Sequence, residues 1–122
     1  MKKEIVEAII DEVVEGIYKA FPMLVEKYGE VGKNKCREDN HHHFKHLDTA
    51  FSLNEEKIFT DYALWLNNVL TSRGMKEDHL IDNFHRIKQA LHTHQSDEAM
   101  KYKQYLQSAI ETIEHVKAKK EI

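Results

Sequence analysis

Apolar residues recur along this chain in steps of three and four, which is the spacing of an amphipathic α-helix. Short runs containing Pro, Gly, Ser and Asn separate the apolar stretches, and these residue types interrupt helices. The pattern predicts five helices, at about residues 3–20, 34–51, 55–72, 76–92 and 96–119. We therefore expect an all-α fold, a compact bundle of about five helices with a long C-terminal helix.

The first and third of these segments are the most apolar. Residues 3–20 carry an apolar stripe wide enough for a largely buried helix or for a helix with two partners. Residues 55–72 are more apolar still, so we expect them at the centre of the bundle. Between the first two helices, Pro22 predicts a break and a short turn, and Gly29 and Gly32 are expected to bracket a loop.

The last segment has apolar positions spaced like the seam of a coiled coil. The central positions of this seam are Tyr102, Leu106, Ala109 and Ile113. Together with the stripe of residues 3–20, they offer more apolar surface than one small bundle is expected to cover. We therefore predict a homodimer whose interface uses the last helix, the first helix or both.

The composition agrees with a single helical domain spanning residues 1–122. Hydrophobic residues make up 41% of the chain and charged residues 32%, and there are only four Gly and one Pro. A β-rich fold of this length needs many more turn-forming residues. The chain is long enough to bury a core without help from a metal or a disulfide.

The charge, the cysteine content and the polar residues near the N-terminus indicate which partners and which cell compartment to expect. The net charge is −3, so the chain has no basic excess to match a phosphate backbone, and we expect no nucleic-acid binding. Its one cysteine rules out an internal disulfide. Acidic residues interrupt every apolar run near the N-terminus, so neither a signal peptide nor a membrane span is expected. The simplest interpretation is a cytoplasmic protein that does not bind membranes.

A thiol, a carboxylate and an imidazole share one side of the second predicted helix. Cys36, Asp39 and His43 fall within an arc of roughly 60° and border an apolar face that includes Phe44. Buried polar groups must be paired or must bind something. One interpretation is a ligand or metal site inside the bundle. The favoured one is structural, in which Asp39 accepts a hydrogen bond from His43 and Cys36 acts as a small apolar residue.

The flank of the same helix carries a second possible metal site. His42 and His46 lie four residues apart, a spacing that allows two imidazoles to share one ion, and Asp39 lies in the same arc. No Glu follows His42, so the helical zinc-protease motif is missing. A weak Zn²⁺ or Ni²⁺ site formed by Asp39, His42 and His46 is the functional hypothesis, and a solvated His-rich flank is the simpler one.

Aromatic residues and one further histidine extend the candidate ligand site. Tyr62 and Trp65 could line a flat cavity with Phe44, although aromatic residues at helical spacing are more often plain core. His85 follows the inward-facing Phe84, so it could reach the interior and hold a tetrapyrrole. The full set of predicted ligand-binding residues is Cys36, Asp39, His43, Phe44, Tyr62, Trp65 and His85. No cofactor is identified.

Several of these residues belong to a longer pattern. It contains Cys36-Arg-Glu-Asp39, His43-Phe44, Leu47, Phe59, Asp61-Tyr62, Trp65-Leu66 and Arg73-Gly74. The pattern resembles a helical module that precedes cobalamin-binding domains in bacterial sensory and regulatory proteins. The resemblance implies a dimerising bundle that senses or couples, with a structural or ligand role for Cys36, Asp39 and His43. In this chain a long helix stands where the cobalamin domain would follow, so cobalamin binding is not carried over.

A weaker similarity connects the second helix to phycobilin-carrying relatives of the globins. These proteins hold a linear tetrapyrrole on the thiol of a Cys-x-Arg-Asp motif. Here the Arg directly follows Cys36, one position early. This difference argues against bilin attachment.

The sequence carries no enzyme signature, because a Gly-rich phosphate loop, a nucleophile elbow and a His-Glu-x-x-His motif are all missing. Cys36 and His43 lie two helical turns apart, too far for a thiol and its base to pair directly. We therefore predict a non-enzymatic sensory or protein-interaction module of bacterial signalling, dimeric and with a possible protein partner. The alternative is a small-ligand protein that binds a tetrapyrrole or a metal.

Overall fold

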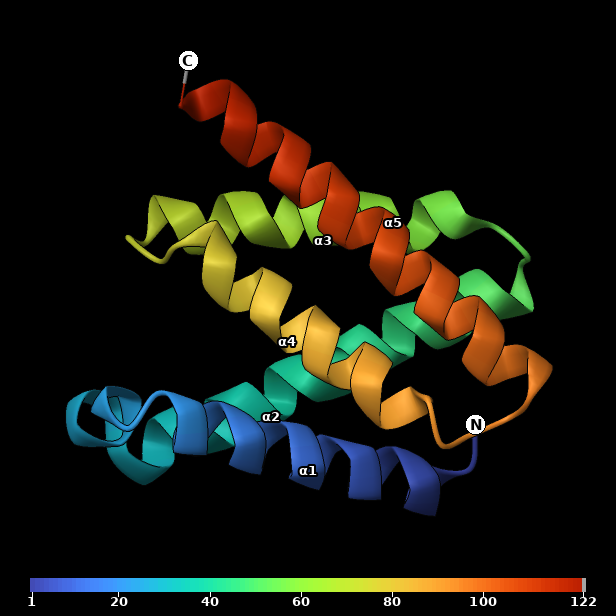
Figure 1. The fold of residues 1–122 in the computed structure, drawn as a ribbon, viewed down its shortest axis with the longest axis horizontal. Helices are drawn as coiled ribbons and strands as arrows, with labels where there is room; N and C mark the ends of the chain where they lie inside the picture. The colour runs from blue at the N-terminus through green and yellow to red at the C-terminus, as the bar shows by residue number, and fades with distance from the viewer. Residues whose placement is uncertain (122) are drawn as a thin grey trace.

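The computed structural model describes residues 1–121 as five α-helices with no strand in that range (Figure 1). The helices are α1 (Lys3–Ala20), α2 (Met23–Ser52), α3 (Glu56–Ser72), α4 (Glu77–Leu91) and α5 (Asp97–Lys120). The predicted all-α bundle and its long last helix are confirmed. None of these helices is apolar over enough of its length to cross a bilayer.

The helices pack so that α4 lies between two pairs. Figure 1 shows α1 running beside α2 at one end of the molecule, while α5 crosses over α3 at the other. α4 contacts both α1 and α5, and α2 continues from the first pair to reach α3 and α5. α2 therefore spans the bundle and contacts helices at both of its ends.

Local sequence signals fix most helix ends. Ser96 caps α5, its hydroxyl accepting a hydrogen bond from the backbone N–H of Ala99. Gly74 has φ +85°, a left-handed conformation that glycine adopts without strain, and it follows the end of α3. The observed bounds of α1, α3, α4 and α5 therefore agree with those predicted to within one residue.

The predicted loop between the first two helices is wrong. α2 already begins at Met23, directly after Pro22, and continues past Gly32. The only break within it is at Gly29, whose φ of 58° and ψ of −152° are accessible to glycine alone. Pro22 suits the start of a helix, and Gly32 is helical. A side chain at Gly32 would collide with Tyr28 and would lie close to the Tyr18 hydroxyl. The two glycines therefore produce a kink and a close contact instead of a loop.

Each helix contributes one stripe of buried side chains to the core. The α1 stripe is buried at Ile9, Ile10, Val13, Val14 and Ile17. Phe59 of α3 and Phe84 of α4 are fully buried and lie 5.4 Å apart between ring centroids. Burial of this apolar surface is the main contribution to the stability of the fold.

The predicted dimer seam on α5 lies inside the single copy. Tyr102 is 1% exposed, and Leu106, Ala109 and Ile113 are fully buried. α5 packs against α3, α4 and α2, which cover this stripe completely. The seam spacing correctly predicted an apolar stripe, but the assignment of these four residues to an interface between copies is wrong, as is the argument that α1 needs a second chain to cover its stripe.

Candidate functional site

His43 and Tyr62 form a buried pair that joins α2 to α3. His43 is 1% exposed, and its Nδ1 shares a hydrogen bond of 2.7 Å with the Tyr62 hydroxyl. The imidazole also packs edge-on against the ring of Phe84, with 5.1 Å between centroids. The ring is thus fixed by one polar partner and one apolar partner from two different helices.

Burial keeps both members of this pair neutral. Burial, together with smaller effects of the nearby His42 and His46, lowers the pKa of His43 to about 3. Burial also raises the pKa of the Tyr62 hydroxyl, and the negative charge of Asp39 adds to the effect. At neutral pH the pair is therefore an uncharged hydrogen bond between an imidazole and a phenol.

The hydrogen-bond partner of His43 differs from the predicted one. The hydrogen bond expected from His43 to Asp39 is not formed, because the imidazole turns across the helix interface to Tyr62. Asp39 is half-buried, and burial raises the pKa of its carboxyl group. Cys36 is also half-buried and packs against the core, where burial and then the charge of Asp39 raise the pKa of the thiol to about 11.

A second buried polar contact was not foreseen from the sequence. Asn40 of α2 and Asn83 of α4 exchange two hydrogen bonds, with donor–acceptor distances of 3.1 and 2.8 Å. Asn40 also donates to the backbone oxygen of Cys36 at 2.9 Å. The available signal was the position of Asn40, which shares a helix face with Cys36. A side-chain amide on an apolar face needs a polar partner from a neighbouring helix.

The predicted metal group of Asp39, His42 and His46 does not assemble. His46 Nδ1 bonds the backbone oxygen of His42 at 2.8 Å, and the imidazole lies flat on the Tyr62 ring, 3.8 Å between centroids and 10° from parallel. Within residues 1–121, no group of three or more His, Cys, Asp or Glu side chains is placed to hold a metal ion. Nδ1 and one ring face of His46 are therefore already engaged in contacts within the protein.

Trp65 points outward, contrary to the expectation of a core or cavity residue. Its side chain is 60% exposed. The buried residues of α3 include Phe59, Ala63 and Asn67, which follow one another at intervals of four. Trp65 lies two residues beyond Ala63, about 200° around the helix, so it faces solvent. Its ring lies 6.4 Å from that of Tyr62, which is a loose contact at the surface.

The remaining predicted ligand residues lie in different parts of the bundle. Phe44 is buried and faces Tyr102 of α5, with ring centroids 6.2 Å apart. His85 is exposed on the outer side of α4. The expectation that His85 follows Phe84 into the interior is wrong, because consecutive helical residues differ by about 100° in direction. The predicted ligand set therefore does not line one cavity.

What the structure does bring together is an aromatic surface. We call the side chains of His46, Tyr62 and Trp65 the α2–α3 aromatic face. The His46 ring stacks on the Tyr62 ring, and the Tyr62 hydroxyl is hydrogen-bonded to the buried His43. Trp65 lies beside them and extends into solvent. Tyr62 is only 8% exposed and His46 is half-buried, so Trp65 is the member of this face that reaches furthest into solvent.

Acidification is expected to destabilise the protein through His43. Its folded pKa of about 3 lies below the unfolded value of 6.5, so its contribution is complete above about pH 6.5 and is lost as the pH falls towards 3. Between pH 8 and pH 5 the loss amounts to about 2 kcal/mol of unfolding free energy. Urea unfolding followed by circular dichroism at the two pH values measures it.

Two glutamine variants isolate this effect. His43→Gln should remove most of the pH dependence between pH 8 and pH 5, whereas His42→Gln, at the exposed neighbouring position, should retain it. This window also avoids Glu77 and Asp78, whose lowered pKa values affect stability only at more acidic pH. An unchanged slope in His43→Gln would show that the imidazole is not buried as described.

Comparison with known protein families, with curated proteins and with solved structures found no match to this chain. The candidate site is therefore located from the geometry of this chain alone, without help from a relative. It consists of the buried His43–Tyr62 pair together with His46, which stacks on Tyr62, and the exposed Trp65 beside them.

Proposed function

We propose that this chain is a non-enzymatic interaction module of the kind used in bacterial sensory and regulatory proteins. A protein partner contacts it through the α2–α3 aromatic face. The observation that carries this proposal is Trp65, which is 60% exposed beside the stacked rings of Tyr62 and His46. Trp and Tyr are strongly enriched among the residues that dominate binding energy at protein interfaces.

Two of the three side chains of the aromatic face are held in place before any partner arrives. Tyr62 is fixed by its hydrogen bond to His43 and by the stacked ring of His46. All three side chains of the face project from helices instead of loops. Because Tyr62 and His46 have little freedom left to lose, a partner that covers them has to order only the Trp65 side chain, which limits the entropic cost.

The ionisable states of Cys36 and His43 support a role without chemistry. A thiol with a pKa of about 11 is almost entirely protonated at pH 7, which makes Cys36 a poor nucleophile. An imidazole with a pKa of about 3 is a weak base, so His43 is poorly matched to proton transfer near neutrality. Both shifts are caused mainly by burial, which fits residues that stabilise a fold.

The small-ligand alternative receives less support from the same residues. A haem or metal would need a free imidazole nitrogen opening into a cavity. The ring of His43 is instead 1% exposed and is packed between Tyr62 and Phe84. His85, the other candidate, lies exposed on α4. A carrier function would require these contacts to be broken.

Site-specific crosslinking in the source cells tests the interaction. A photo-reactive amino acid in place of Asn68, which is exposed one turn from Trp65, should yield one adduct of defined mass. Adding Trp65→Ala should reduce that adduct on the order of tenfold or more, as expected for a central aromatic contact. Quantitative mass spectrometry of the adduct provides the measurement.

The matched control places the same photo-reactive group at Met100, an exposed apolar position on α5. It should not give the same adduct. Because Trp65 is largely solvated, Trp65→Ala should leave the circular dichroism spectrum and the unfolding free energy nearly unchanged. An adduct at position 68 that persists in the Trp65→Ala background would exclude the aromatic face as the contact.

A further inference from the structure

The two halves of α3 are anchored to the bundle to different degrees. Every buried apolar side chain of α3 lies in its first half, at Phe59, Tyr62 and Ala63. In the second half, residues 64–72, the only buried side chain is that of Asn67, which is 1% exposed. The apolar side chains of this half are only half-buried, apart from the exposed Trp65: Leu64, Leu66, Val69 and Leu70. The buried apolar stripe of α3 therefore ends at Ala63, although the helix continues.

The side chain of Asn67 is buried without a hydrogen-bond partner. Both its amide nitrogen and its amide oxygen are unpaired, and no other buried side-chain nitrogen or oxygen in residues 1–121 is in this position. Burial of such a group is unfavourable, because its hydrogen bonds to water are lost and are not replaced. Asn40 and Asn83 avoid this cost by exchanging two hydrogen bonds. Asn67 therefore disfavours the arrangement that buries it.

Polar contacts from α3 to other helices are also confined to its first half. Tyr62 shares its hydrogen bond with His43 of α2, and Glu56 accepts a hydrogen bond of 2.8 Å from the Ser108 hydroxyl of α5. In the part of the chain that the structure describes, the second half of α3 makes no such contact. Its hydroxyl side chains donate to backbone oxygens of the same helix: Thr71 and Ser72. These local bonds do not hold the second half against a neighbour.

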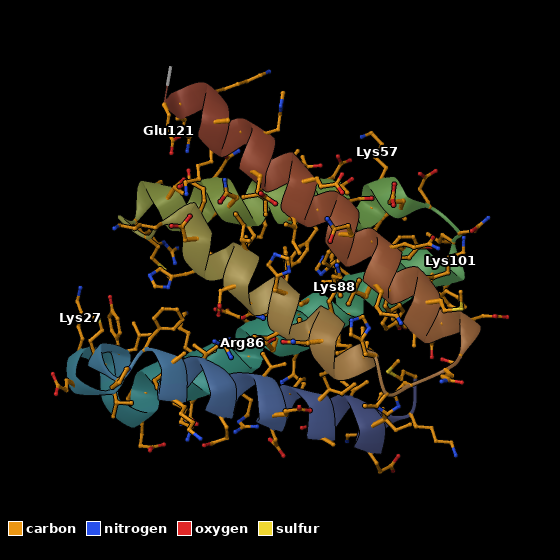
Figure 2. All side chains as sticks on the ribbon, in the orientation of Figure 1. Lys27, Lys57, Arg86, Lys88, Lys101 and Glu121 are labelled. Carbon is orange, nitrogen blue, oxygen red and sulfur yellow. The ribbon has the colours of Figure 1, made fainter. Side chains whose placement is uncertain are left out.

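From these observations we infer that the second half of α3 opens locally while the rest of the bundle stays folded. Opening lets water reach the Asn67 amide, and the other side chains it uncovers are already in partial contact with solvent. The first half, which the label of Lys57 marks in Figure 2, keeps its contacts with α2 and α5. Protein segments with few buried apolar contacts are the ones that open at low free energy.

The opening gives the α2–α3 aromatic face two arrangements. Trp65 belongs to the second half of α3, whereas Tyr62 and His46 are fixed to each other by stacking. In the closed arrangement Trp65 lies beside Tyr62, and in the open one it leaves that position. The opening is a property of the chain alone, so this inference goes beyond the proposed function and does not rest on it.

Hydrogen exchange of the purified full chain, resolved by residue with NMR, tests the inference. After correction for intrinsic rates, the amides of residues 68–72 should exchange about tenfold faster or more than those of residues 88–91. These segments are the last turns of α3 and α4, so fraying at a helix end affects both, but α4 ends on the fully buried Leu91. Equal protection of the two turns in the wild type would overturn the local opening.

Asn67→Leu tests the cause of the opening. Leucine is similar in size to asparagine but has no polar side-chain atom, so exchange at residues 68–72 should slow by about tenfold or more. Asn68→Leu is the matched control, because it makes the same replacement at the exposed neighbouring position, and it should leave exchange at residues 69–72 unchanged.

Unchanged or faster exchange in a folded Asn67→Leu variant would mean that the buried amide stabilises the closed arrangement, and would overturn the inference. Circular dichroism establishes that the variant is folded. The comparison of the two helix ends in the wild type decides the inference even if Asn67→Leu does not fold.

Discussion

Phe84→Ala is expected to lower the unfolding free energy by about 3–5 kcal/mol, the range observed when a buried aromatic ring is truncated in a core. Phe84 is fully buried and contacts the rings of both His43 and Phe59. Its removal leaves a cavity where α2, α3 and α4 meet. The surrounding helices cannot close this cavity without disturbing the His43–Tyr62 pair.

Urea unfolding followed by circular dichroism measures this loss. His85→Ala is the matched control, because His85 is the adjacent residue on α4 but is exposed, and its replacement should change stability by no more than about 0.5 kcal/mol. Similar losses at the two positions would mean that Phe84 does not face the core. A loss well below 2 kcal/mol would mean that the bundle repacks around the missing ring.

Asn40→Leu should cost about 3 kcal/mol, the second largest expected effect. The substitution removes both hydrogen bonds to Asn83 and leaves the buried Asn83 amide without its partner. An orphaned buried polar group costs about 1–3 kcal/mol beyond the bond itself. The bond from Asn40 to the Cys36 backbone oxygen is lost as well.

The double variant Asn40→Leu/Asn83→Leu distinguishes this mechanism from simple misfit. It removes both amides, so no polar group of the pair stays unsatisfied, and it should be more stable than the sum of the single losses by about 1 kcal/mol or more. Asn34→Leu, at an exposed position of α2, serves as the control and should be near neutral. Additive losses would show that the two amides do not depend on each other.

The helix bounds were predictable because local signals determine them. The apolar period and the cap at Ser96 placed α1, α3, α4 and α5 correctly. α2 was not predictable in this way, because Pro22 begins a helix as readily as it ends one. Gly29 likewise permits a kink as well as a loop, and the local sequence does not distinguish between the two.

The candidate site was predictable only in part, because its contacts join different helices. Helical period correctly placed His43 towards the interior, but its partner, Tyr62, lies on α3. Trp65 was assigned to the core because α3 is apolar over much of its surface, and only the packing shows that Ala63 faces inward instead. On α5 the same period revealed a stripe without revealing that α3 and α4 cover it.

The exposure of Trp65 has a consequence for optical studies of this protein. It is the only tryptophan in the chain, and more than half of its surface already meets water in the folded state. Its emission should therefore lie close to that of the unfolded chain, so a denaturation curve followed by tryptophan fluorescence would show little change. The same indole would respond strongly when another molecule excludes water from it, which makes its emission a poor reporter of folding and a direct reporter of occupancy.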